Sequence, residues 1–477
     1  MVVDLVIKNG HLVIPKQGII DAGIAVEDGK IVAICSEPNL PKSDKIIDAE
    51  GKYVLPGVID PHTHYGHTYG RYRLDFGENV QSETISAVLG GITTVNVIHR
   101  LYPATASYFD FFSKEVDPVI EKSSTNFLIT PGIMTQQHVD EMQRYASELG
   151  ITSFKFFRGY KGGEWRNMGI SGLDDGVFYA MLMQAARMGE SSLSLVHCEN
   201  SEIANYTTEK AKREGKSGLS AWDDARPKAA ETDSILSAIH LACVVAKTRL
   251  YVPHVTTDQG IDCIVRAKLE GKSVIAETCP HYLCFTKDDK KIGILGKINP
   301  PLRDLASVER LWERIFDGTI DTIGTDHVPV RLKDKVGNGD IWTAGLAFPG
   351  SATMIPVLLS EGHNKRGLSL QRIVEMTSYN TARTFGLFPR KGTLAQGVDA
   401  DMTIVDIKKE VTATADMLGS AAGFTLFEGW KFKGWPTHTI VNGHLVMENG
   451  SYIGRPGLGT YLRRSLNNPP PLSVKTT

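Results

Sequence analysis

Short apolar segments alternate with longer amphipathic stretches through the middle of the chain, between residues 56 and 390. The apolar segments have the length of buried strands and occupy residues 58–60, 93–98, 127–130, 153–157, 194–197, 250–254, 274–277 and 322–325. The stretches between them, such as 177–188 and 232–248, are predicted helices. These repeated strand–helix steps favour an α/β fold with a (β/α)8 TIM barrel over an open doubly wound sheet.

Both ends of the chain have a different, strand-rich pattern. Apolar β-branched segments flank Asn9-Gly10 near the N-terminus and Asn442-Gly443 near the other end. These dipeptides are typical of hairpin turns. We therefore predict one β-sandwich built from residues 1–55 and 391–455, with the barrel at 56–390 and an extended C-terminal tail at 456–477.

Composition and charge limit the kinds of molecule that the protein is expected to bind. The 477 residues include 52 Lys and Arg against 54 Asp and Glu, so there is no basic excess to attract nucleic acid. The sequence lacks a long apolar run typical of a membrane span and the basic and apolar regions of a signal peptide. Six scattered cysteines fit reduced thiols. We expect a cytoplasmic protein that acts on a small molecule and binds neither nucleic acid nor membrane.

The candidate chemistry begins with two histidines, His62 and His64, which follow the first predicted barrel strand. Residues two apart on a strand face the same side, so both imidazoles can reach one ion. Such a pair alone is a weak indication, because β-rich segments also carry histidines by chance. Three further side chains add weight: His197, His254 and Asp326. They lie at or just beyond the C-terminal ends of predicted strands, where barrel enzymes place their active sites.

Lys155 lies inside the predicted strand Ser-Phe-Lys-Phe-Phe. An inward ammonium is costly there unless its charge is paired or removed. A lysine that has reacted with carbon dioxide becomes a carbamate, an anion able to hold two metals about 3.5–4 Å apart. Imidazoles and one carboxylate can serve a single ion, whereas two divalent ions require such a bridge. The set of donors therefore favours a binuclear site with carboxylated Lys155.

Several longer motifs accompany these residues: VHCEN at 196–200, ETCPHYL at 277–283, NPPLR at 299–303, GTDH at 324–327 and GTLAQGVDAD at 392–401. Together with the candidate ligands, they make the chain similar to the hydantoinase/dihydropyrimidinase group of the amidohydrolase superfamily over nearly its whole length. The resemblance implies a barrel with a β-sandwich built from both termini. It also implies a homo-oligomer, either a tetramer or a dimer.

The resemblance assigns three residues to the more buried metal: His62, His64 and Asp326. It assigns two residues to the more exposed metal: His197 and His254. Carboxylated Lys155 and a hydroxide would bridge the two ions. Zn²⁺ suits these ligands, and Mn²⁺, Co²⁺ or Fe²⁺ also fit them.

The implied reaction opens the C–N amide bond of a cyclic amide or imide, such as a hydantoin, a dihydropyrimidine or a related ring. The bridging hydroxide would attack the carbonyl. Asp326 would take the proton as general base and deliver it to the leaving nitrogen. Tyr160, which follows Lys155 at the spacing found in hydantoinases, would donate to the developing oxyanion. The alternative for Tyr160 is an ordinary loop aromatic.

The predicted substrate contacts depart from the family pattern. Asn299 stands where hydantoinases usually carry a serine, and Leu346 stands where they tend to carry an asparagine. A site that loses one polar partner of the ring discriminates differently among substrates. Arg73, or Arg71, could hold a substrate carboxylate from the loop after the histidine pair. An ion pair with a nearby surface acid is the alternative.

Two other functions stay open at this stage. A mononuclear, deaminase-like amidohydrolase would keep the histidines and Asp326, but a single ion needs no bridge, and Lys155 argues against this interpretation. A non-catalytic adaptor protein related to dihydropyrimidinase would have lost its metal ligands. This chain keeps every ligand position and Tyr160.

Overall fold

The structure of the protein is a computed structural model that describes residues 2–66, 68–69, 72–161 and 174–467. The middle of the chain contains parallel strands: β6 (Val58–Thr63), β9 (Ile92–His99), β10 (Asn126–Pro131), β11 (Ser153–Phe157), β12 (Leu193–His197), β13 (Leu250–Val252), β14 (Val274–Thr278) and β15 (Thr322–Ile323). Each coincides with a predicted apolar segment to within a few residues. A short antiparallel pair, β7 (Thr68–Tyr69) and β8 (Tyr72–Arg73), follows β6.

The parallel strands pair in sequence order. β6, β9 and β10 form one sheet, and β11 to β15 form a second. Isolated parallel bridges link the two sheets, one between Gly132 and Lys155 and the other between Thr63 and His327. All residues of β9, β10, β11 and β12 are buried. Because these strands are covered on both faces, they form near-continuous apolar runs in the sequence.

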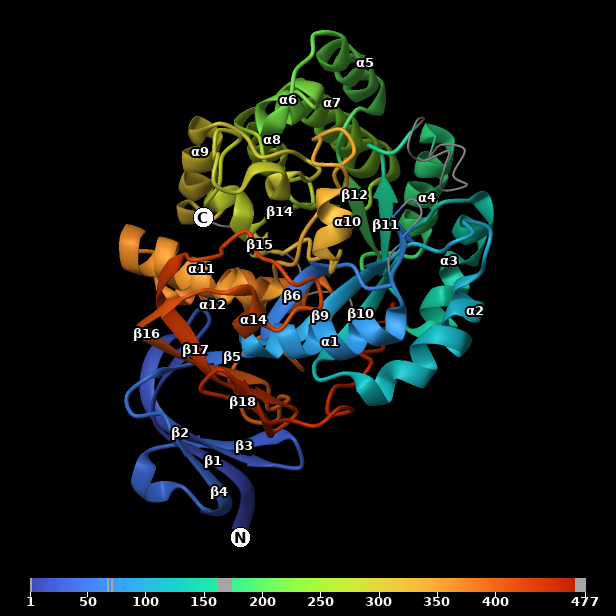
Figure 1. The fold of residues 1–477 in the computed structure, drawn as a ribbon. Helices are drawn as coiled ribbons and strands as arrows, with labels where there is room; N and C mark the ends of the chain where they lie inside the picture. Colours follow the sequence, from blue (N-terminus) through green and yellow to red (C-terminus); the bar gives the residue numbers. More distant parts are fainter. Residues whose placement is uncertain (1, 67, 70–71, 162–173, 468–477) are drawn as a thin grey trace.

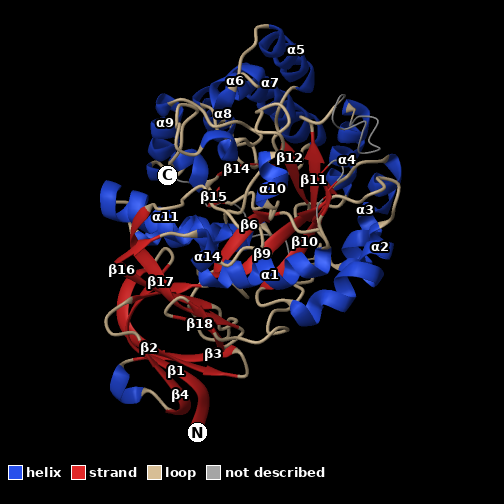
Figure 2. Cartoon of the chain, viewed as in Figure 1, coloured by secondary structure: helices blue, strands red, loops and turns tan. Residues whose placement is uncertain are grey.

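Helices surround these strands (Figures 1 and 2). The α-helices are α1 (Phe76–Leu89), α2 (Tyr108–Phe111), α3 (Gln136–Leu149), α4 (Asp175–Arg187), α5 (Ser201–Arg213), α6 (Gly218–Ala225), α7 (Lys228–Ile239), α8 (Asp258–Leu269), α9 (Leu305–Phe316), α10 (Leu332–Val336), α11 (Met354–Val357), α12 (Leu370–Val374), α13 (Asn380–Thr384) and α14 (Ala415–Leu418). The predicted runs at 177–188 and 232–248 correspond to α4 and to α7 with its π-helical continuation.

One helical stretch, Gly218–Ala246, is long and apolar enough to cross a membrane by length and composition alone. Its mean hydropathy reaches 1.3, and 44% of the apolar window is buried within the fold. Core helices of soluble proteins meet the same criteria, and α7 within this stretch packs on α8.

Strands from both ends of the chain join in a single nine-stranded sheet. Its strands are β1 (Val2–Ile14), β2 (Gly18–Glu27), β3 (Lys30–Cys35), β4 (Lys42–Asp48), β5 (Tyr53–Pro56), β16 (Met402–Thr412), β17 (Lys431–Val441), β18 (His444–Glu448) and β19 (Ser451–Tyr452). The two ends meet where β16 pairs antiparallel with β5. Buried residues from both ends, including Leu12 and Met402, share one apolar core.

The predicted turn at Asn9-Gly10 is wrong. β1 continues through this dipeptide, and its register with β2 shifts between Ile7 and Gly10. Asn9 has a φ of 55°, a left-handed backbone conformation that would also suit a hairpin turn. Here this conformation forms a β-bulge within the strand. Asn442-Gly443 does connect β17 to β18 as predicted, with φ values of 48° and 80°.

The last described residues pack against the parallel strands. Tyr461 bridges to Phe127 of β10, and Leu462 is fully buried. Arg464 donates to the Ser153 hydroxyl at 2.7 Å and to the Ile129 carbonyl at 2.8 Å. Residues 456–467 are therefore fixed to the fold rather than free of it, and residues 468–477 lie outside the described part.

Candidate active site

One pocket gathers the candidate residues at and beyond the carboxyl ends of the parallel strands. Its lining includes every predicted metal ligand: His62, His64, Lys155, His197, His254 and Asp326. It also includes Tyr160, Asn299 and Leu346. The Arg73 side chain and the whole of Arg71 lie outside the described residues, so their predicted contact with substrate stays a prediction.

The first group of donors is His62, His64 and Asp326, whose ligand atoms lie within 4.8 Å of one another. Asp326 Oδ1 is 3.0 Å from His64 Nε2 and 3.3 Å from His62 Nε2. Burial alone would raise the pKa of Asp326, but the two neighbouring histidines outweigh it and lower that pKa below its usual value. Asp326 is therefore a carboxylate at neutral pH, the form that binds a cation or accepts a proton.

The opposite nitrogen of each ring is fixed by a buried acceptor. His62 Nδ1 lies 2.8 Å from Glu277 Oε1, and His64 Nδ1 lies 2.8 Å from the Ile98 carbonyl oxygen. Since a carbonyl oxygen only accepts, His64 donates from Nδ1 and keeps the Nε2 lone pair toward the pocket. Burial lowers the pKa of His64 to about 4, so the ring is neutral. A neutral ring held from behind is the usual form of a metal-binding histidine.

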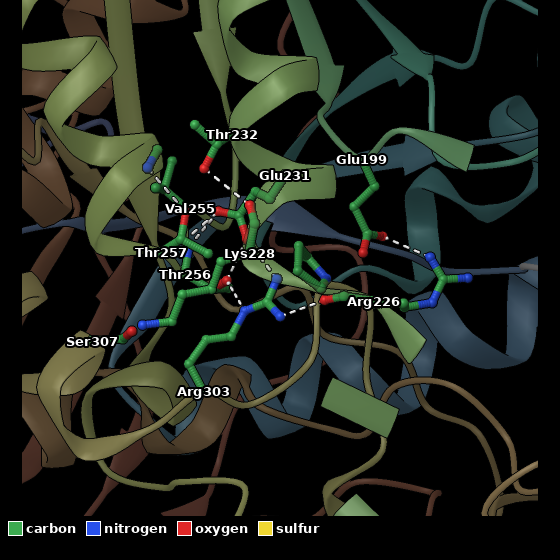
Figure 3. Close-up of polar contacts among 12 residues, drawn as sticks. Glu199, Arg226, Lys228, Glu231, Thr232, Val255, Thr256, Thr257, Arg303 and Ser307 are labelled. Carbon is green, nitrogen blue, oxygen red and sulfur yellow. Dashed lines mark hydrogen bonds and ion pairs between the residues drawn. The ribbon is translucent and has the colours of Figure 1, made fainter. Parts of the chain in front are cut away.

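The second group of donors is His197 and His254, which come from neighbouring strand ends. His197 Nδ1 lies 3.0 Å from His254 Nε2. His197 Nε2 lies 2.7 Å from Glu199 Oε2. The same Glu199 oxygen accepts from Arg226 at 3.1 Å (Figure 3). Burial lowers the pKa of both histidines. Two largely neutral imidazole nitrogens from different strands thus converge on one position, as a shared cation requires.

His254 and Asp326 adopt left-handed backbone conformations, with φ values of 42° and 49°. Both residues lie beyond their strands, since β13 ends at Val252 and β15 at Ile323. The predicted strands 250–254 and 322–325 are therefore too long. Each left-handed residue costs about 1–3 kcal/mol, and such strain concentrates at functional sites.

Lys155 is fully buried in the middle of β11. Among the described residues, its Nζ has no hydrogen-bond partner. Burial lowers the pKa of this amine to about 8. A buried amine without a partner is costly as it stands, and it shares the pocket with oxygen and nitrogen donors that suit divalent ions. The donors around Lys155 therefore fit a site for divalent metal ions.

Tyr160 stacks on His197, with ring centroids 4.8 Å apart. Burial raises the pKa of the Tyr160 hydroxyl above its usual value, so the group remains a proton donor at neutral pH. The Arg100 guanidinium lies 5.6 Å from the Tyr160 ring and lines the same pocket. The sequence did not identify Arg100, although it directly follows β9 and so lies at the strand edge where the other site residues gather.

Asn299 is buried, and neither its amide nitrogen nor its amide oxygen has a hydrogen-bond partner among the described residues. A buried amide with both groups unused is suited to a ligand that offers an adjacent donor and acceptor. Leu346 lines the pocket near Asn299 and provides no such group. Ala347 donates to the Lys297 carbonyl at 3.2 Å, which ties the two lining segments together.

A network of buried charges holds the segment after β13 (Figure 3). Glu231 accepts from the Thr256 backbone amide at 2.8 Å, and Arg303 donates to Glu231 at 3.0 Å. Arg303 also donates to the Thr256 hydroxyl at 2.9 Å. The arginine of the NPPLR motif therefore fixes the loop that carries His254. Sequence reasoning quoted the motif but assigned Arg303 no role.

The α/β fold carries histidines, a lysine and an aspartate grouped in one pocket. The chain belongs to the amidohydrolase family, whose model matches residues 53–446. More particularly, the L-hydantoinase of Paenarthrobacter aurescens is 33% identical over 472 residues, covering 97% of this chain and 98% of that protein. The D-hydantoinase of Geobacillus stearothermophilus is 32% identical over 469 residues and covers 96% of both chains.

The solved structures agree with these relatives. The crystal structure of dihydropyrimidinase from Brevibacillus agri NCHU1002 matches with a TM-score of 0.89 at 28% identity, covering 97% of this chain and 98% of that one. The predicted family is confirmed, and the chain is an enzyme of the cyclic amidohydrolase kind.

Proposed function

We propose that the chain is a binuclear metal-dependent hydrolase that opens the C–N bond of a cyclic amide or imide, such as a hydantoin, a dihydropyrimidine or a related ring. The observation that carries this proposal is the fully buried Lys155 amine, which shares a pocket with two groups of metal-binding side chains. The relatives also support this proposal, since hydantoinases and a dihydropyrimidinase match nearly the whole chain.

The proposed ligand sets follow the two groups of donors. His62, His64 and Asp326 would hold one ion, His197 and His254 would hold the other, and carboxylated Lys155 would contact both. Zn²⁺ suits these ligands, and Mn²⁺, Co²⁺ or Fe²⁺ are alternatives. When bound, two such ions supply a hydroxide nucleophile at neutral pH and polarise the amide carbonyl.

Residues of the chain would then transfer the protons and bind the substrate ring. Asp326, a carboxylate at neutral pH, would accept the proton of the nucleophile and return it to the leaving nitrogen. Tyr160, held in its protonated form by burial, would donate to the oxygen that gains charge. Asn299 would pair with the N–H and C=O groups of the ring.

Replacing Tyr160 with phenylalanine is expected to lower kcat by roughly ten- to a thousandfold, because the oxyanion would lose one donor. The phenyl ring can still stack on His197, so metal content and melting temperature should match the wild type. Steady-state kinetics on hydantoin and dihydrouracil would measure the change. An unaltered kcat would show that the Tyr160 hydroxyl is directed elsewhere.

Replacing Asn299 with alanine is expected to lower kcat/KM by about ten- to a hundredfold on ring amides, because polar groups of the bound ring lose their partner. Leu346→Ala is the matched control, since it truncates a pocket-lining side chain that has no polar group. Comparing kcat/KM across a panel of cyclic amides would separate the two positions. Equal losses in both variants would contradict a recognition role for the amide.

The finer architecture belongs to the same proposal. We propose that β6 and β9 to β15 close into a (β/α)8 barrel, supported by the two bridges that link their sheets. Residues 1–55 and 391–455 would form the smaller β-sandwich. Assembly as a homotetramer or dimer and a cytoplasmic location stay predictions.

A further inference from the structure

Glu277, a fully buried carboxylate in β14, contacts both groups of metal-binding side chains. Its Oε1 lies 2.8 Å from His62 Nδ1 and accepts from the His254 backbone N–H at 3.1 Å. His62 belongs to the first proposed ligand set and His254 to the second. A single carboxylate oxygen therefore fixes one residue of each set.

The other oxygen of Glu277 is also engaged. Tyr251 donates its hydroxyl to Oε2 at 2.6 Å, and that hydroxyl lies 2.8 Å from the Thr322 hydroxyl. The carboxylate packs against Gly324, where an added Cβ would lie only 2.5 Å from it. Both oxygens are bonded and Gly324 packs against one face, so these contacts fix the orientation of the Glu277 carboxylate.

The main chain of Glu277 supports the same loop. The Val255 amide donates to the Glu277 carbonyl at 2.8 Å, so two successive amides after β13 bond to this one residue. His254 has a left-handed backbone with a φ of 42°, a strained conformation that needs such support. Glu277 thus stabilises the bend that brings the His254 ring into the pocket.

A second buried acid provides a comparison within the same site. Glu199 contacts the His197 ring at 2.7 Å and is itself held by Arg226. Among the described residues, Glu199 bonds to His197 and Arg226, neither of which belongs to the first ligand set. Glu199 therefore supports one ligand set, whereas Glu277 supports both.

We propose that Glu277 is a positioning residue that couples the two metal sites, so that the affinities for both ions depend on it. This inference rests on the proposed binuclear function. A displaced Glu277 carboxylate would release the His62 ring and the His254 loop together. Removing an outer partner of a metal ligand typically costs about ten- to a hundredfold in metal affinity, and here we expect that loss for both ions.

The test is a metal titration of the full-length protein after chelator treatment. Zn²⁺ binding is measured in competition with a chromophoric chelator, and bound metal per chain is measured by mass spectrometry. Glu277→Ala is expected to weaken both equivalents by about ten- to a hundredfold. Glu199→Ala should weaken one equivalent, and Glu313→Ala, at an exposed acid that pairs with Arg310, should bind two equivalents as the wild type does.

The metal-free proteins are compared by circular dichroism and thermal melting. This comparison distinguishes a variant that no longer positions its metal ligands from one that no longer folds. If Glu277→Ala does not fold, Glu277→Gln takes its place, because it keeps the side-chain size and removes the charge. Weakening of one equivalent only, or of neither, would overturn the coupling. A wild-type protein that binds fewer than two equivalents would instead contradict the binuclear function on which the coupling rests.

Discussion

Asp326→Asn is expected to lower kcat by about a hundred- to ten-thousandfold, the range for losing a general acid–base group. The carboxylate lies 3.0 Å from His64 Nε2 and 3.3 Å from His62 Nε2, so it is placed both to bind an ion and to move a proton. Asparagine has nearly the same size but is a weak ligand and does not accept a proton at neutral pH. The loss should therefore appear in kcat and in metal content.

The fold should survive this substitution, because the backbone bend at Asp326 has a φ of 49°, a conformation that asparagine tolerates. Asp262→Asn is a matched control, since Asp262 is a half-exposed acid that pairs with Arg310 and Arg314 on the surface. Kinetics, metal analysis and melting curves of both variants would check the expectation. Activity of Asp326→Asn within a few-fold of the wild type would exclude the general-base role.

Strand positions were predictable from the sequence because a buried parallel strand needs an apolar run. β11 coincides with the predicted segment 153–157. Strand ends were less predictable: β13 ends at Val252 and β15 at Ile323, before the left-handed residues His254 and Asp326. A local sequence pattern does not reveal this, since the bend at His254 is held by contacts with Glu277 of β14.

The grouping of the candidate ligands in one pocket was predictable from residue type and position along the chain, but the contacts that support them were not. Glu277 reaches His62 across 215 positions of sequence. Before folding, an acid within a motif is equally consistent with a surface ion pair. The prediction of a hairpin turn at Asn9-Gly10 was wrong for a related reason. A β-bulge and a hairpin turn both favour residues with positive φ, so the dipeptide does not distinguish them.

Three of the candidate ligands are oriented by hydrogen-bond partners outside the pocket. His62, His64 and His197 are each held from the nitrogen opposite the pocket, by Glu277, by the Ile98 carbonyl and by Glu199. These contacts orient three of the six candidate ligands. Lys155 differs from these three residues, since its Nζ has no hydrogen-bond partner among the described residues.

Lys155→Ala is therefore expected to have the second large effect. Bound metal should fall below two equivalents, and kcat/KM should fall by more than about a hundredfold, the upper range for outer-shell partners, because Lys155 would be a ligand itself. Lys210→Ala, at an exposed lysine that pairs with Glu214, is the control. Metal analysis and kinetics after reconstitution with Zn²⁺ or Mn²⁺ and bicarbonate would measure both quantities.

The same experiment separates the competing functions. With isotope-labelled bicarbonate, the wild type should show a carbamate signal by NMR that Lys155→Ala lacks. About one equivalent of metal in the wild type, unaffected by Lys155→Ala, would defeat the binuclear site and favour a mononuclear, deaminase-like enzyme. A reconstituted wild type that is inactive on every cyclic amide tested would instead favour a non-catalytic relative of dihydropyrimidinase. Loss of metal, carbamate and turnover together in Lys155→Ala is the result that only the bridging role predicts.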